Sequence, residues 1–272
     1  MSVAIVLPAR LKSTRLPNKL LLSRTGKTLL EHTIDRAKLA QAKYPKLFTN
    51  IRVACDDESL IAAARKTGVD AVMTDPNHQS GTDRIAEAAK DLKEEIIVNL
   101  QADEPEINPE NLARVASLLL EAGARKDVMM STLAVPIYLT IDFIKPSNVK
   151  VVCDNCGRAL YFSRAPIPVD RDGPAFQVKR DANTPALGLH HIGIYGYRRV
   201  FLSEFGKLPP SKLEQLEKLE QLRVLEAGYG IQVGVVDAHT AGIDTPEDYE
   251  AFVTRWNSQE AKTKSQEPGA KS

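Results

Sequence analysis

The first 122 residues alternate short apolar runs with longer stretches whose apolar positions recur at helical spacing. The apolar runs at residues 3–7, 51–54 and 95–100 predict strands buried on both faces, because strands of a helix-covered parallel sheet have near-continuous apolar sequences. Helices are predicted between and after these strands, at residues 28–43, 58–66, 83–93 and from Pro109 onward. This order predicts an α/β fold with a mostly parallel central sheet and helices on both faces.

After residue 128 the pattern changes. Further strands are predicted with few helices between them, at residues 130–135, 149–152, 159–162 and 189–197. We interpret residues 130–200, approximately, as a mixed-sheet extension of the same domain that serves substrate binding or dimerisation. Residues 212–227 have a leucine at every third position from Leu213 to Leu225, and they predict one continuous helix with a broad apolar face.

The C-terminal part contains two more predicted elements, a strand at residues 231–236 and a helix at residues 245–257. Thr245 suits the N-cap of this helix, and Pro246 suits its first position. A single domain is therefore expected over residues 1–257. Residues 258–272 contain almost no apolar side chains, so we expect them to form a disordered tail.

The composition excludes several classes of protein. A net charge of +1 over 272 residues provides no basic surface for nucleic acid, and no apolar run approaches the roughly 20 residues that a membrane-spanning helix needs. The N-terminus lacks the pattern of a signal peptide. Three cysteines do not suggest a disulfide framework, and Cys153 and Cys156 are interpreted as part of a turn between strands. We expect a cytoplasmic protein.

A basic loop follows the first predicted strand and brings Arg10, Lys12, Arg15 and Lys19 within ten residues. In open α/β sheets, ligands bind beyond the carboxyl ends of the strands. The position of the loop therefore favours a polyphosphate-binding site, with a solvated charged loop as the alternative. The sequence does not match the P-loop pattern.

Two acidic positions could complete such a site. Asp103 and Glu104 follow the strand at residues 95–100, which should place them at the same edge of the sheet as the basic loop. Magnesium binds one or two carboxylates together with phosphate oxygens and water. Asp103 could alternatively cap a turn, and Asp244 could either supply a second carboxylate or begin the last helix. The pattern favours magnesium-assisted displacement on a nucleotide phosphate and leaves the transferred group open.

Seven segments, in this order over residues 3–255, resemble the 3-deoxy-manno-octulosonate cytidylyltransferase family: PARLKSTRLPNK, HQSGTDR, NLQADEP, LYFSRAPIP, HHIGIYGYR, LEQLRVLEAG and GIDTPEDY. These are the CMP-Kdo synthetases of Gram-negative lipopolysaccharide biosynthesis. The resemblance implies a Rossmann-like nucleotidyltransferase fold, a homodimer, and a magnesium-dependent reaction of CTP with Kdo that yields CMP-Kdo and pyrophosphate. One departure is Ala102, where the family motif has glycine.

The resemblance also implies roles for individual residues. Those expected to contact CTP are Ala9, Arg10, Ser13, Lys19 and Ser80. Asp103 and Asp244 would bind magnesium and take part in catalysis together with Lys19. Those expected around the sugar acid are Arg15, Gln101, Arg164, His191, Tyr195, Glu220 and Gln221. The two arginines suit its carboxylate, because a guanidinium can bind two oxygens at once. Lys12 is expected to face solvent without a role.

Two alternatives remain open from the sequence. The chain could be a cytidylyltransferase for another sugar acid, such as an 8-amino Kdo analogue or a sialic-acid-like compound, because such relatives share the basic loop. It could also be a catalytically silent nucleotide-binding protein on the same scaffold. The presence of both Asp103 and Asp244 argues against a silent protein.

Overall fold

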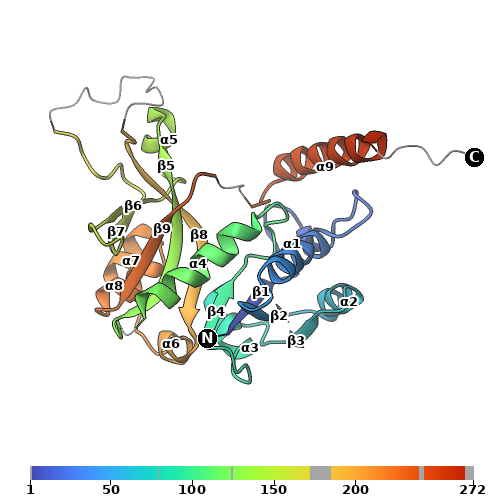
Figure 1. Cartoon of the computed structure of the whole chain (residues 1–272), viewed down its shortest axis with the longest axis horizontal. Coiled ribbons are helices and arrows are strands. Elements are labelled where there is room, and N and C mark those ends of the chain that lie inside the picture. Colours follow the sequence, from blue (N-terminus) through green and yellow to red (C-terminus); the bar gives the residue numbers. More distant parts are fainter. Residues whose placement is uncertain (1, 79, 124, 172–184, 239–241, 267–272) are drawn as a thin grey trace, which may run out of the picture.

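The computed structural model describes residues 2–78, 80–123, 125–171, 185–238 and 242–266, with side chains up to residue 261. Within this part of the chain, nine strands form one sheet whose main path runs in the order β3-β2-β1-β4-β8-β5-β9 (Figure 1). The strands are β1 (Val3–Ala9), β2 (Phe48–Cys55), β3 (Asp70–Met73), β4 (Ile96–Asn99), β5 (Val128–Ile137), β6 (Lys150–Cys153), β7 (Ala159–Ser163), β8 (Gly188–Arg198) and β9 (Gly230–Val235). The predicted α/β class is confirmed.

Helices cover both faces of the sheet. They are η1 (Lys19–Leu21), α1 (Leu29–Lys43), α2 (Glu58–Lys66), α3 (Gly81–Ala88), α4 (Pro109–Ala122), α5 (Thr140–Ile144), α6 (Arg199–Phe205), α7 (Lys212–Glu217), α8 (Gln221–Glu226) and α9 (Pro246–Gln266). Alternate residues of β1 belong to different cores. Ile5 packs in the core that contains apolar residues of α1, α2, α4 and α9, while Val6 packs with those of α3, α6 and α8. This two-sided burial explains the uninterrupted apolar sequence of β1.

The direction of β8 divides the sheet. Strands β1, β2, β3 and β4 are parallel to one another, and β5 is parallel to β9. Strand β8 lies between β4 and β5 and is antiparallel to both. The hairpin of β6 and β7 branches from β8, so the strands after residue 128 form the mixed part of the sheet (Figure 1).

The hairpin turn contains the two closely spaced cysteines. The Cys156 N–H donates to Asp154 Oδ1 at 2.8 Å, and Gly157 adopts a positive φ of 75°. Both thiols are free, and burial raises the pKa of Cys153 to about 11. The predicted turn is therefore confirmed.

The prediction of one continuous helix over residues 212–227 is wrong, because the structure has two helices there, α7 and α8. Lys218 has φ 54° and ψ 48°, a left-handed conformation that ends α7. Leucines three residues apart drift around a continuous helix and cannot all share one face. After the break Leu219 and Leu222 are buried, whereas Leu216 is 71% exposed.

The last helix begins as predicted, since the Asp248 N–H donates to Thr245 Oγ1 at 3.2 Å. It ends later than predicted, because α9 continues to Gln266 through residues expected to be disordered. Those residues include good helix formers and contain no proline or glycine. Residues 267–272, and most of the Pro- and Gly-containing segment before β8, lie outside the described residues.

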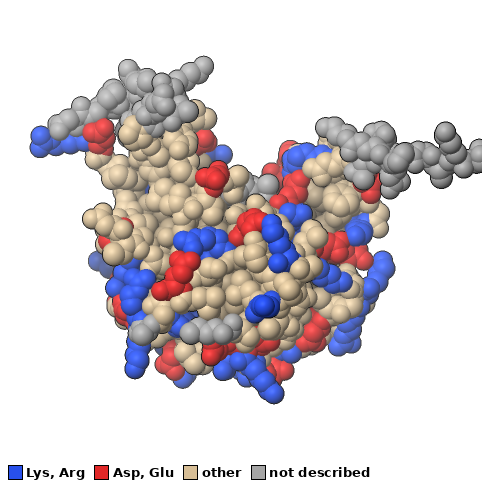
Figure 2. All heavy atoms as spheres, in the orientation of Figure 1, with Lys and Arg blue, Asp and Glu red and all other residues tan. Residues whose placement is uncertain are grey.

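The visible surface carries both signs of charge. Figure 2 shows lysine and arginine interspersed with aspartate and glutamate over this face, without a continuous basic area. In the described part of the chain, no helix is both long and apolar enough to cross a membrane.

Candidate active site

A pocket of about 370 Å³ opens where β1 and β4 end. Most of its lining comes from the end of β1, the basic loop and η1, namely Pro8, Arg10, Lys12, Ser13, Thr14, Arg15, Lys19 and Leu20. The other lining residues are Gly81, Gln101, Ala102, Asp103 and Asp244. Residues from four separate segments of the sequence thus meet at the sheet edge predicted for ligand binding.

Lys19 lies between the two predicted metal ligands. Its ammonium donates to the carboxylate of Asp103, to Asp244 Oδ1 at 3.0 Å and to the carbonyl oxygen of Ile243 at 3.0 Å. Burial alone lowers the pKa of Lys19, but Asp103 and Asp244 together raise it above its ordinary value. Lys19 is therefore a cation at neutral pH that holds the loop after β4 against the start of α9.

The two carboxylates fit a magnesium ion. Asp103 and Asp244 both contact the same ammonium, so oxygens from each can reach a common point. Asp244 Oδ2 also pairs with Arg15 Nη2 at 2.9 Å. Among the described residues, no group of three histidine, cysteine or acidic side chains could hold a metal. A two-carboxylate site suits magnesium that takes its remaining ligands from phosphate and water.

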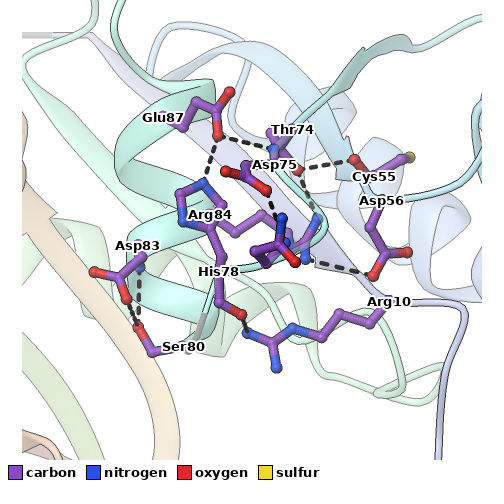
Figure 3. A network of polar contacts seen from close by, with 11 residues as sticks. Arg10, Cys55, Asp56, Thr74, Asp75, His78, Ser80, Asp83, Arg84 and Glu87 are labelled. Atoms are coloured by element: carbon purple, nitrogen blue, oxygen red, sulfur yellow. Dashed lines mark hydrogen bonds and ion pairs between the residues drawn. The ribbon is translucent and has the colours of Figure 1, made fainter.

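The basic loop is tied to its neighbours by a polar network (Figure 3). Arg10 Nη2 donates to the carbonyl oxygen of His78 at 3.1 Å, and the Leu11 N–H donates to Asp56 Oδ1 at 2.9 Å. Asp56 Oδ2 lies 3.4 Å from Arg84 Nη2, whose side chain is fully buried. Asp56 and Arg84 are functional candidates that sequence reasoning missed, although Arg84 belongs to the HQSGTDR segment.

Two of the residues expected to contact the nucleotide, Ala9 and Ser80, do not line the pocket, whereas Arg10, Ser13 and Lys19 do. Ala9 is fully buried, so only its main chain could approach a nucleotide. Ser80 is the N-cap of α3, where its hydroxyl accepts from the Asp83 N–H at 3.1 Å and donates to the Asp83 carboxylate at 2.9 Å. Ser80 does not line the pocket, whereas its neighbour Gly81 does.

Four of the expected sugar-acid residues lie in the pocket lining and on strand β8. Arg15 and Gln101 line the pocket, and Gln101 Nε2 donates to Asn99 Oδ1 at 3.1 Å. Asn99 is paired with Tyr195 across β4 and β8. The rings of Tyr195 and His191 lie 5.5 Å apart. Residues on β8 therefore continue the site beyond the end of β4.

Glu220 reaches the same region from α8. Thr82 Oγ1 donates to Glu220 Oε2 at 2.7 Å and lies 3.4 Å from the Tyr197 hydroxyl. Burial raises the pKa of Glu220, and hydrogen bonds from Thr82 and Ser80 oppose the shift. Gln221 is buried, and its Nε2 has no partner among the described residues. Thr82 directly follows Gly81 of the pocket lining, so its hydrogen bond connects Glu220 to the edge of the pocket. The HQSGTDR segment alone did not indicate this role.

Arg164 lies apart from the pocket lining. Its guanidinium donates to the carbonyl oxygens of Glu217, Pro146 and Lys218, at 2.7, 3.1 and 3.4 Å. These contacts place Arg164 at the junction of α7 and α8. These three contacts use three of the five N–H donors of the guanidinium, so the carboxylate-binding role that the resemblance implies would depend on the remaining two.

Two further expectations concern the pocket itself. Lys12 is exposed, as expected, and it also lines the pocket. Ala102, which replaces the family glycine, is not among the described residues with positive φ. Its carbonyl oxygen accepts from Thr33 Oγ1 at 2.9 Å. The backbone at Ala102 therefore needs no glycine for its conformation.

The mostly parallel sheet, with a cationic loop and two facing carboxylates at its carboxyl edge, defines a nucleotidyltransferase. A family model described as cytidylyltransferase matches residues 4–233. The chain is 44% identical over 257 residues to a 3-deoxy-manno-octulosonate cytidylyltransferase of Syntrophobacter fumaroxidans, covering 93% of this chain and 96% of the relative. It is 45% identical over 255 residues to the protein of that name from Vibrio campbellii, covering 92% and 96%.

Solved structures agree with these relatives. A structure of CMP:2-keto-3-deoxy-manno-octonic acid synthetase complexed with CTP superimposes with a TM-score of 0.82 at 37% identity, covering 95% of this chain and all of that chain. A cytidylyltransferase from Leptospira borgpetersenii, 17% identical with a TM-score of 0.58, shares the fold and covers 99% of both chains. The chain belongs to the 3-deoxy-manno-octulosonate cytidylyltransferase family, as its motifs predicted.

Proposed function

We propose that this protein joins CTP and 3-deoxy-D-manno-octulosonate (Kdo) into CMP-Kdo and releases pyrophosphate, for lipopolysaccharide biosynthesis. The observation that carries this proposal is the contact of Lys19 with both Asp103 and Asp244 inside a cationic pocket. The relatives of the same name and the CTP complex of a similar structure support the choice of substrates.

The reaction is an in-line displacement at the α-phosphorus of CTP. The anomeric oxygen of Kdo forms the new bond to the α-phosphorus, and the bond from the α-phosphorus to the oxygen that bridges it to the β-phosphorus breaks. That oxygen leaves as a terminal oxygen of pyrophosphate, and the hydroxyl proton passes to solvent. Arg10 and Ser13 would bind the triphosphate from the loop. Arg15 lines the pocket and pairs with Asp244, and it would bind the carboxylate of Kdo.

We propose that magnesium is the metal held by Asp103 and Asp244. When bound, it would supply positive charge close to the phosphate oxygens on which negative charge develops. Lys19 would keep the two carboxylates together and add its own charge to the same pocket. The fully buried Arg84 and its partner Asp56 would hold the loop main chain at Leu11 while the substrates bind.

A substrate panel tests the proposal. Purified protein is incubated with magnesium, each of the four nucleoside triphosphates, and Kdo, its 8-amino analogue or N-acetylneuraminate, and pyrophosphate is measured. We expect release only with CTP, and fastest with Kdo. Release with N-acetylneuraminate alone would assign the protein to another sugar acid. CTP binding without release in any mixture would identify a silent nucleotide-binding protein.

We further propose that the protein acts as a homodimer in the cytoplasm. The extension exposes several large apolar side chains close together in sequence, Tyr138, Leu139, Ile141 and Ile144. Such clusters are typical of protein interfaces, and Ile141 is 67% exposed. Free cysteines and the need for CTP are consistent with a cytoplasmic enzyme. Light scattering should give a dimer mass for the wild type and a monomer mass for Ile141→Glu.

A further inference from the structure

The junction between α7 and α8 is fixed by polar contacts that lie outside the pocket lining. Glu217 is the last residue of α7, and its carboxylate accepts from Ser163 Oγ at 2.6 Å and from the Arg164 N–H at 3.0 Å. The Arg164 guanidinium in turn binds the carbonyl oxygens of Glu217 and Lys218. Carbonyl groups at a helix end lack partners within the helix, and here the side chain of Arg164, the residue after β7, donates to two of them.

A buried lysine supports these contacts from the other side. Lys150 is fully buried, and its ammonium donates to the carbonyl oxygen of Arg164 at 2.7 Å. It also donates to the carbonyl oxygens of Lys145 and Asn148, at 3.1 and 2.5 Å. Burial lowers the pKa of Lys150, with Glu217 opposing the shift and Arg164 adding to it. Both the main chain and the side chain of Arg164 are thus held in place.

These contacts surround the left-handed turn at Lys218. Its φ of 54° lies in a region of backbone conformation that residues other than glycine and asparagine rarely adopt. The turn redirects the chain, so that Leu219 and Leu222 enter the core and Glu220 reaches Thr82. In an uninterrupted helix, the direction of the Glu220 side chain would be fixed by the helical repeat that begins in α7. The break at Lys218 removes this constraint.

We propose that the left-handed turn at Lys218, held by Lys150, Arg164 and Glu217, is a positioning device for the sugar acid. It determines where Glu220 and Gln221 lie relative to Thr82 and the pocket. Lys150, Glu217 and Lys218 are therefore positioning residues, which affect sugar-acid binding without touching the substrate. The inference rests on the proposed function, because it assigns the residues of α8 to the sugar acid.

The sharpest test compares two substitutions of Lys218 in the full chain. Lys218→Asn and Lys218→Val remove the same charge, but asparagine tolerates a left-handed conformation and a β-branched valine opposes it. We expect Lys218→Val to raise the KM for Kdo at least tenfold while the KM for CTP stays within twofold. Lys218→Asn should keep both KM values within twofold of the wild type. Glu217→Ala, which removes two of the contacts, should behave like Lys218→Val.

Amide hydrogen exchange gives a readout that is independent of turnover. The α8 amides should exchange faster in Lys218→Val than in Lys218→Asn, while the α4 amides exchange equally in both. Equal KM values for Kdo in the two variants would overturn the inference, as would a parallel rise of both KM values in Lys218→Val. A wild type that fails to use Kdo would overturn the proposed function, and this inference with it. Normal wild-type turnover with indistinguishable variants would overturn this inference alone.

Discussion

Replacing Lys19 with methionine should expose how strongly the two carboxylates depend on their shared cation. Methionine keeps the apolar length of the side chain but donates no hydrogen bond. In Lys19→Met, Asp103 and Asp244 would face each other without the ammonium that now contacts both. We therefore expect a metal-free variant that is less stable than the wild type, and whose stability responds more strongly to magnesium.

The magnitude follows from the exposure of each partner. A hydrogen bond to a charged group contributes about 1.5 to 3 kcal/mol to folding stability. Because the Asp103 side chain is only 24% exposed, its contact with Lys19 should contribute about 2 kcal/mol. The Asp244 side chain is 45% exposed, so solvent screening leaves about 0.5 kcal/mol for its pair. The sum of roughly 2.5 kcal/mol corresponds to a fall in Tm of about 5 to 10 °C for a chain of this size.

Thermal unfolding with and without magnesium measures both effects. Lys12→Met is the matched control, because it removes a cation from the same loop and Lys12 has no ion pair among the described residues. Magnesium should raise the Tm of Lys19→Met more than that of the wild type or of Lys12→Met, since no ammonium competes for the carboxylates. A Tm for metal-free Lys19→Met within 1 °C of the wild type, or an equal magnesium response in all three proteins, would refute the reasoning.

Three more outcomes are expected. Asp103→Asn should reduce turnover about 100-fold but weaken CTP binding less than about threefold, because the carboxylate acts mainly on charge that develops in the transition state; unchanged turnover would contradict its metal role. Arg15→Ala should raise the KM for Kdo roughly tenfold, with little change for CTP; an effect on CTP alone would assign Arg15 to the nucleotide. His32 is buried near Lys27, and both effects lower its pKa below 6.5. The unfolded chain then binds a proton that the folded chain does not, so stability falls as the pH drops below about 6.5, and His32→Gln should lose less Tm than the wild type between pH 7.5 and 5.5.

The position of the pocket could be predicted because it depends on local sequence and sheet direction. The apolar strand before Arg10 and the one before Gln101 run parallel, so the polar residues after them meet at one edge. The place of Asp244 did not follow from spacing. It depends on a segment that returns to the loop from the far end of the chain, and only the family resemblance predicted it.

The structure around the residues expected to bind the sugar acid was less accessible to sequence reasoning, because tertiary contacts override the local pattern. Residues 212–227 have good helix formers throughout, and the break at Lys218 depends on Arg164, which is distant in the sequence. Asn99 and Thr82 likewise gain their roles only when β8 is inserted between β4 and β5. A propensity argument cannot anticipate either arrangement.

The antiparallel direction of β8 would separate the two specificities of the proposed site. Because β8 runs against its neighbours, the middle of the strand, and not a loop beyond its end, lies beside the carboxyl end of β4. Tyr195 and His191 are thus presented from a hydrogen-bonded strand, while the triphosphate would be bound by the loop after β1. Side chains on a strand can be exchanged with little change in the main chain. Evolution could therefore replace the acceptor sugar by substituting positions on β8 while leaving the CTP-binding half intact.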